Sequence, residues 1–283
     1  MSDNQRAPIA SVGIIYRERS SEAAALAQTL EERIRATGRR VWSAERDGES
    51  ALGDRLPGTD VALVLGGDGT ILSVARLVAP LNIPILGINF GRVGFLTELE
   101  PSEVEEKLAL YLGGDYWVDE RSMLQAEVGD NGQHHRFIAL NDIVVVRGAE
   151  PRVIYIKIWI DGHNYNTTVA DGIIVSTATG STAYNLAAGG PILHPQVRSS
   201  VITPLAPHLV ADRSLILEPN AVITLELEDD STAVLSADGQ INRDLGEHAQ
   251  VVIRGNAHVT KFLRRRPPTY FYRILSAKLR DNL

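Results

Sequence analysis

The residues best suited to chemistry in this sequence form the run Gly66-Gly67-Asp68-Gly69-Thr70. A wholly apolar stretch precedes the run at 61–65, and a segment with helical spacing follows it at 71–79. A loop that enters a helix exposes unpaired backbone N–H groups at the positive end of the helix dipole, which suits phosphate. Glycines there lack the Cβ atoms that would hold phosphate oxygens away from the backbone. The pattern therefore predicts a phosphate loop formed by Gly66, Gly67, Gly69 and Thr70.

Asp68 is the unusual member of this loop, because a carboxylate repels phosphate unless a proton transfer or a metal ion makes use of it. Two functional roles fit: general base for an attacking hydroxyl, or indirect holder of a metal ion. The structural alternative is that Asp68 caps the following helix. Glycines on both sides are unnecessary for capping, which favours a functional carboxylate. The loop is neither a Walker A loop nor a Rossmann turn.

A second glycine cluster, residues 87–94, ends the next apolar stretch at 83–90. The carboxyl ends of parallel strands meet at one edge of a sheet, where ligands gather. We therefore expect this cluster at the same edge as the phosphate loop. A plain strand-to-helix turn explains the glycines equally well.

The second half of the chain carries a different set of polar residues. Asn141-Asp142 falls inside a strand pattern at 137–146, where a polar pair is unfavourable unless it is used. Asp171-Gly172 opens an apolar strand that continues into the hydroxyl-rich run 176–185. Small residues let a flat ring approach, while hydroxyls and amides recognise ribose and base edges. This run favours a nucleoside-binding segment over its alternative, an ordinary helix entry capped by Ser or Thr.

The elements that must position these residues follow two patterns. In the first third, strand patterns at 9–16, 40–44, 61–65 and 83–90 alternate with helical ones, the first opened by Ser20 or Ser21. This order predicts a parallel sheet covered by helices. From Trp117 onward, short strands without long helices predict an antiparallel sandwich or barrel-like domain. They lie at 124–128, 137–146, 153–160, 172–176, 215–217, 221–227, 233–237 and 250–254, with a hairpin turn at Asp130-Asn131-Gly132.

We therefore predict an α/β plus all-β protein. Residues 1–118 form a Rossmann-like parallel α/β domain, and residues 119–262 form an antiparallel β-sandwich domain. Residues 263–283 are a tail with a helical pattern at 270–279, expected to pack back on the N-terminal domain. The basic run at 264–266 is more typical of a solvated surface or an interface than of a phosphate contact.

Composition narrows the class of protein. The 283 residues are 44% hydrophobic and 22% charged, enough for a normal core, and the net charge of −7 argues against a nucleic-acid partner. The absence of cysteine excludes disulfides and Cys-ligated metals. Residues 1–6 are polar, and no apolar run approaches the roughly 20 residues of a membrane-spanning helix. We expect a cytoplasmic protein that does not enter a membrane.

At these residues the sequence resembles the NAD kinase family over nearly its full length. The motifs are 65–70, Gly87-Ile88-Asn89 with 94–97, Ala139-Leu140-Asn141-Asp142, the long segment 171–192, and Asp238-Gly239-Gln240. The resemblance implies transfer of the terminal phosphate of ATP to the 2′-hydroxyl of the adenosine ribose of NAD, giving NADP. It implies that Asp68 is the proton acceptor, and it implies no residue as a direct metal ligand. The other NAD-contacting positions that it implies are Gly69, Asn141, Asp142, Arg152, Val169, Asp171, Thr182, Ala183, Tyr184, Asn185, Leu186, Ala187, Ala206 and Gln240.

The resemblance also implies a divalent metal ion, Mg²⁺ or Mn²⁺, and a homodimer or homotetramer. Asp142 stands where many members carry Glu, so its carboxylate reaches about one methylene less far. Val169 stands at a variable position, which leaves the choice between NAD and NADH open. ATP and polyphosphate both remain possible donors. The alternatives are a lipid or sugar kinase with the same loop and a non-catalytic dinucleotide sensor.

Overall fold

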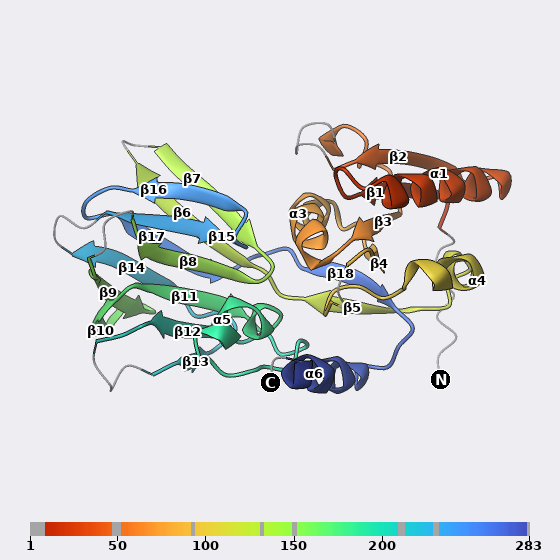
Figure 1. Ribbon diagram of the computed structural model, residues 1–283. Coiled ribbons are helices and arrows are strands. Elements are labelled where there is room, and N and C mark those ends of the chain that lie inside the picture. The colour runs from red at the N-terminus through yellow and green to blue at the C-terminus, as the bar shows by residue number, and fades with distance from the viewer. Residues whose placement is uncertain are drawn as a thin grey trace. The chain divides into compact units, whose positions relative to one another are not determined.

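The computed structural model describes residues 9–46, 52–91, 94–130, 133–148, 152–208, 213–228 and 232–281. The chain divides into two compact units, one made of Met1–Glu120 with Thr260–Leu283, the other of Arg121–Val259. The first contains a largely parallel sheet with helices, and the second contains two antiparallel sheets (Figure 1). The predicted fold class is therefore confirmed. Each unit is described separately below.

The first unit is built on a six-stranded sheet in the order β2-β1-β3-β4-β18-β5. Strands β1 to β4 and β18 make parallel pairs, and the apolar strand β3 is buried along its whole length, as expected for a central parallel strand. The strand bounds are Ser11–Tyr16 (β1), Arg40–Glu45 (β2), Val61–Gly66 (β3), Ile85–Asn89 (β4), Trp117–Arg121 (β5) and Thr260–Arg264 (β18).

Helices α1 and α4 of this unit begin at capping residues, whereas α3 begins at Asp68, three residues before the predicted start at 71. Ser20 is the N-cap of α1, and its side chain accepts a hydrogen bond from the Ala23 amide at 3.3 Å. Glu100 and Glu103 form a capping box at the start of α4. The helices span Ser21–Ala36 (α1), Asp68–Val78 (α3), Pro101–Leu112 (α4) and Tyr270–Asp281 (α6), with a short 3₁₀ turn at Ala79–Leu81.

Strand β18 differs in part from expectation, since the predicted second domain, 119–262, includes its first three residues. It pairs with β4 in the first sheet, with Phe262 beside Ile85. The basic run that starts at Arg264 also differs, because that arginine is buried and not solvated. The carboxylates of Glu98 and Asp119 lie 3.3 and 3.6 Å from its guanidinium and compensate the buried charge.

The second unit is a sandwich of two six-stranded antiparallel sheets. One has the order β10-β9-β14-β17-β6-β7 and the other β13-β12-β11-β8-β15-β16. In the first sheet the strands span Leu124–Asp130 (β6), Gln133–Ala139 (β7), Ile154–Ile160 (β9), His163–Ala170 (β10), Ile223–Glu228 (β14) and Gln250–Gly255 (β17). In the second they span Asp142–Arg147 (β8), Gly172–Thr177 (β11), Ser200–Leu205 (β12), Leu215–Leu217 (β13), Ala233–Ala237 (β15) and Ile241–Leu245 (β16).

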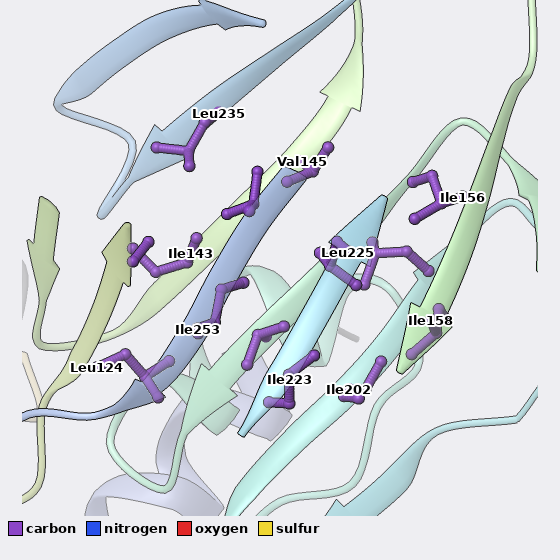
Figure 2. Close-up of a cluster of buried hydrophobic side chains, with 14 of the residues drawn as sticks. Leu124, Ile143, Val145, Ile156, Ile158, Ile202, Ile223, Leu225, Leu235 and Ile253 are labelled. Carbon is purple, nitrogen blue, oxygen red and sulfur yellow. The ribbon is translucent and has the colours of Figure 1, made fainter. Parts of the chain in front are cut away.

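The inner faces of the two sheets supply the core of this unit. Alternate side chains such as Ile156 and Ile158 of β9 and Ile143 and Val145 of β8 belong to one cluster between the sheets, and all are almost fully buried (Figure 2). The two-residue period of a strand explains why one face is apolar while the other stays available for a ligand.

The predicted strand at 137–146 is wrong in one respect, because the structure contains two strands there, β7 and β8, in different sheets. The chain changes sheet at Leu140 and Asn141. The hairpin before it is confirmed by the antiparallel β6–β7 pair, although Asn131 and Gly132 of the turn lie outside the described residues. Among the helices that the structure describes, none is long and apolar enough to span a membrane.

Candidate active site

The two glycine segments of the first unit lie at one edge of the sheet, as the sequence predicts. Gly66 at the end of β3 is in register with Asn89 at the end of β4, and the Phe90 amide donates to the Gly66 carbonyl at 3.2 Å. Arg17, which directly follows β1, reaches the same edge and donates to the Phe90 carbonyl at 2.9 Å. Sequence reasoning missed this cation, although its place after a parallel strand was a usable signal.

The glycines of the phosphate loop have two separate uses. A Cβ on Gly66 would lie 2.4 Å from the Thr70 Oγ1, so the turn back onto Thr70 requires glycine. A Cβ on Gly67 would meet no atom of the described residues within 4 Å, so among these residues the space above this N-cap is open to a ligand. An open helix N-terminus is the geometry that suits a phosphate oxygen.

Asp68 does not act as the cap of α3. The N-cap is Gly67, and it makes no side-chain capping bond. The carboxylate of Asp68 instead accepts hydrogen bonds from the amides of Phe95 at 3.0 Å and Leu96 at 3.2 Å, one on each oxygen. Each oxygen keeps acceptor capacity for a hydroxyl. The carboxylate is thus oriented and partly exposed, which favours the functional interpretation over the structural one.

The loop that holds Asp68 is itself fixed. Gly94 lies so close that a Cβ on it would be 1.9 Å from the Asp68 Oδ1. The buried amide of Asn89 donates to the Gly91 carbonyl at 3.2 Å and to the Glu100 carboxylate at 3.1 Å. The second glycine cluster is therefore more than a plain turn, because the missing side chain of Gly94 lets the backbone of this loop lie against the Asp68 carboxylate.

In the second unit, Asn141 and Asp142 lie at the corner where the chain changes sheet. The backbone amides at this corner donate to the carboxylate of Asp238, from Leu140 at 3.0 Å, Asn141 at 2.7 Å and Asp142 at 3.3 Å. One carboxylate that is distant in sequence thus accepts hydrogen bonds from the backbone amides at the corner, where the chain passes from one sheet to the other. Asp238 was noted only as part of a motif, and its role at the corner was missed.

Asp142 is buried beside this second carboxylate. Burial, together with the smaller effect of the negative charge of Asp238, raises the pKa of Asp142 from 3.8 to about 7. At neutral pH the group is therefore close to its titration midpoint. A ligand that donates a hydrogen bond here would favour the carboxylate form.

We expect the raised pKa of Asp142 to make the stability of the folded protein depend on pH. The pKa of folded Asp142 lies above its unfolded value, so this group's contribution to stability is full at low pH and is lost as pH rises from about 4 through about 7. Asp142→Asn removes the titration, so its melting temperature relative to the wild type should rise between about pH 5 and about pH 8. Calorimetry at both ends of this range measures the change. An unchanged difference would contradict the raised pKa.

Part of the predicted NAD-contacting set surrounds one cavity of about 500 Å³ in this unit, a size typical of small-molecule sites. Val144 and Val146 contribute to it from the face of β8 that points away from the sandwich core. The polar and aromatic side chains of the lining are Asn141, Asp142, Tyr184, Ser236, Asp238 and Asn242, and the small residues Ala183 and Gly239 also line the cavity. An apolar wall with a few convergent polar groups is what a nucleoside base and ribose require.

The hydroxyl-rich segment packs against this corner. The Thr177 Oγ1 donates to the Leu140 carbonyl at 2.6 Å, and a Cβ on Gly180 would lie 2.1 Å from the Asn141 carbonyl oxygen. Asn185 is fully buried. The hydrogen bonds of its side-chain amide with Ser181, Pro191 and Thr203 hold the segment together. Its side chain is therefore committed to structure, while the neighbouring Tyr184 is exposed.

The remaining predicted residues do not line this cavity. Asp171, in contact with Arg147 at 3.0 Å, lies at the far end of the β8–β11 ladder, about 15 Å from Asp142 by strand geometry. Val169 and Ala206 lie near Asp171, since Asp171 bonds to Leu205 and Val169 to His208. Thr182 lies in the hydroxyl-rich run, and Leu186 and Ala187 follow it in the short helix Tyr184–Ala187. Arg152 and Gln240 are exposed on loops.

A phosphate loop with an oriented carboxylate on an α/β unit, and a nucleoside-sized cavity on a β-sandwich, define a nucleotide-dependent phosphotransferase. Family models of the ATP-NAD kinase N-terminal and C-terminal domains match residues 54–116 and 140–265. The chain belongs to the ATP-NAD kinase family.

Curated relatives and solved structures agree with this assignment. The NAD kinase of Dehalococcoides mccartyi is 41% identical over 96% of both chains, and that of Chloroflexus aurantiacus is 41% identical over 90% of this chain and 91% of its own. An NAD kinase from Archaeoglobus fulgidus, solved in complex with ATP, has a TM-score of 0.77 at 25% identity and covers 95% of this chain and 98% of its own. Yeast NADH kinase, solved with NADH, shares the fold at a TM-score of 0.79 and 24% identity, over 92% and 85%.

Proposed function

We propose that this chain transfers the terminal phosphate of ATP to the 2′-hydroxyl of the adenosine ribose of NAD, giving NADP and ADP. Family membership and the 41% identity to NAD kinases support the reaction. The observation that carries the proposal is the Asp68 carboxylate, held by two backbone amides beside an open helix N-terminus.

Asp68 acts on the acceptor hydroxyl. A phosphoryl transfer with a loose transition state gains mainly from positioning and charge neutralisation. The fixed carboxylate therefore orients the 2′-hydroxyl first and accepts its proton late in the transfer. The glycine loop at 66–70 receives the phosphates through backbone N–H groups.

The second unit holds the dinucleotide in this proposal. Asn141 and Asp142 bond to the ribose and adenine, and the segment 182–187 encloses the adenosine, with Tyr184 and Ala183 at the cavity. Asp171 takes the nicotinamide side. The separation of about 15 Å between Asp142 and Asp171 suits the two ends of an extended dinucleotide. Gly69, Arg152, Val169, Ala206 and Gln240 make further contacts.

The residues fit a divalent ion that arrives with ATP. Among the residues that the structure describes, no three His, Asp or Glu side chains form a preformed metal cluster. Mg²⁺ is commonly held by substrate phosphates and waters together with one or two carboxylates, and in this proposal Asp68 would hold it only indirectly, since no residue is assigned as a direct ligand. When bound, Mg²⁺ or Mn²⁺ would neutralise charge on the phosphates.

We further propose a cytoplasmic homodimer or homotetramer. Edge strands β10 and β13 carry exposed apolar side chains, Tyr165 at 51% and Ile216 at 50%. Exposed apolar groups on open sheet edges are candidates for an interface between copies. Sedimentation equilibrium would distinguish the dimer from the tetramer.

A coupled assay tests the reaction directly. We expect NADP formation from NAD with ATP and Mg²⁺, and the same mixtures with polyphosphate or NADH define donor and acceptor preference. Titration calorimetry with NAD serves as the parallel measurement. Binding of NAD without any NADP formation would support a dinucleotide sensor, and phosphorylation of a lipid or a sugar in its place would support another kinase class.

A further inference from the structure

Arg264, at the end of β18, contacts the same loop that holds Asp68. Its Nη1 donates to the Thr97 carbonyl at 2.9 Å and its Nη2 to the Phe95 carbonyl at 3.4 Å. Glu98 and Asp119 lie 3.3 and 3.6 Å from the same guanidinium. The arginine side chain is only 7% exposed, so these contacts are shielded from solvent.

Phe95 connects the two ends of this chain of contacts. Its amide donates to the Asp68 carboxylate, and its carbonyl accepts from Arg264. Because each peptide group is planar and rigid, fixing the Phe95 carbonyl also fixes the Leu96 amide of the same peptide group, which donates to the Asp68 Oδ1. The position of the Asp68 carboxylate is therefore coupled to Arg264, which lies 196 positions later in the sequence.

Helix α6 holds the side chain of Phe95 from another direction. The rings of Phe95 and Phe271 are 5.8 Å apart, and the Lys278 Nζ lies 5.2 Å from the Phe95 ring centroid. A tilted aromatic pair and a cation over a ring are both attractive arrangements. The loop is thus fixed through its backbone by β18 and through its side chain by α6.

We infer that Arg264 is a positioning residue for phosphoryl transfer, because it fixes the backbone that aligns the Asp68 carboxylate with the acceptor hydroxyl. This inference rests on the proposed role of Asp68. Arginine suits the task, since its planar guanidinium reaches two carbonyls and two carboxylates at once. Lysine keeps the charge but not this fixed fork of donors.

Arg264→Lys is the direct test, because it keeps a cation beside Glu98 and Asp119. We expect kcat to fall by about 10- to 100-fold, since a misplacement of about 1 Å can lower turnover by about 100-fold. KM for NAD and ATP should change little, because Arg264 touches neither proposed binding segment. Arg265→Lys is the matched control: its side chain pairs with Asp115 at the surface, at 2.8 Å, and kcat should stay at the wild-type value.

Combination with Asp68→Asn separates this inference from the proposed function. If Arg264 acts through Asp68, Arg264→Lys should lower kcat far less in the Asp68→Asn background than in the wild type. A large kcat loss in Asp68→Asn with full kcat in Arg264→Lys overturns the positioning role alone, as would a loss confined to KM. Full activity of Asp68→Asn overturns the proposed role of Asp68 itself.

A second variant keeps the test decisive if Arg264→Lys melts too low to assay. Phe271→Leu removes the ring that packs on Phe95 and leaves the buried charges untouched. A fall in kcat with unchanged KM supports the positioning of the loop by the C-terminal segment. An unchanged kcat in this variant overturns it.

Discussion

Asp68→Asn is expected to lower the turnover of NAD phosphorylation by about 10²–10⁴-fold, the range typical of a lost general base. The amide cannot accept the hydroxyl proton, although it can still occupy the same space. One of its two positions becomes an NH₂ that faces the Phe95 or Leu96 amide, donor against donor, so a modest drop in melting temperature should accompany the loss. Initial rates at saturating NAD and ATP measure the effect on kcat.

Asp60→Asn provides the matched control for this prediction. The Asp60 carboxylate also holds two backbone amides, those of Ala10 at 2.7 Å and Ser11 at 2.8 Å, but it precedes β3 and so lies at the opposite edge of the sheet from the loop. Its substitution should lower stability in a similar way and leave kcat unchanged. Near-normal turnover in Asp68→Asn would contradict the base assignment.

The first sheet and its phosphate loop could be predicted from the sequence because their signals are local. A buried apolar strand, a glycine turn and a helix follow one another directly at 61–78, and each has its own periodicity. The same holds for α1, whose cap at Ser20 lies next to the helix that it starts.

The partners of the key carboxylates could not be predicted in this way. Asp68 bonds to amides 27 and 28 residues later, and Asp238 bonds to amides 96 to 98 residues earlier. The apolar pattern of 137–146 runs across the corner because β8 is buried from Asp142 to Val145, shortly after the buried end of β7. The corner between them depends on the distant carboxylate, which local periodicity does not report.

The sheet to which a late strand belongs is also a tertiary property. No strand is predicted at 260–264 from the sequence, and the place of β18 beside β4 depends on the long-range pairing of Phe262 with Ile85. Arg264 follows the same logic, since three consecutive arginines are typical of a solvated surface. Its burial is stable only because Glu98 and Asp119 come from other parts of the fold to meet it.

Gly94→Ala is expected to lower kcat almost as far as Asp68→Asn, although it adds only a methyl group. A Cβ at this position would lie 1.9 Å from the Asp68 Oδ1, so either the carboxylate or the loop must move. Both movements break the hydrogen bonds from Phe95 and Leu96. They also move the Asp68 carboxylate away from the position in which it would accept the proton of the 2′-hydroxyl. Gly91→Ala is the control from the same loop. Among the described residues its Cβ would meet only the Asn89 Oδ1, at 3.9 Å, so this substitution should leave turnover unchanged.

A double variant identifies the cause of the expected loss in Gly94→Ala. Asp68→Ala removes the carboxylate that the new methyl group would strike, so adding Gly94→Ala to it should lower neither the residual turnover nor the melting temperature much further. The two single substitutions would then be strongly non-additive, as expected for atoms that exclude each other. Additive losses in kcat and melting temperature would show that Gly94 acts through the loop backbone independently of Asp68. The double variant therefore decides whether glycine is needed here for access to the carboxylate or for the path of the chain.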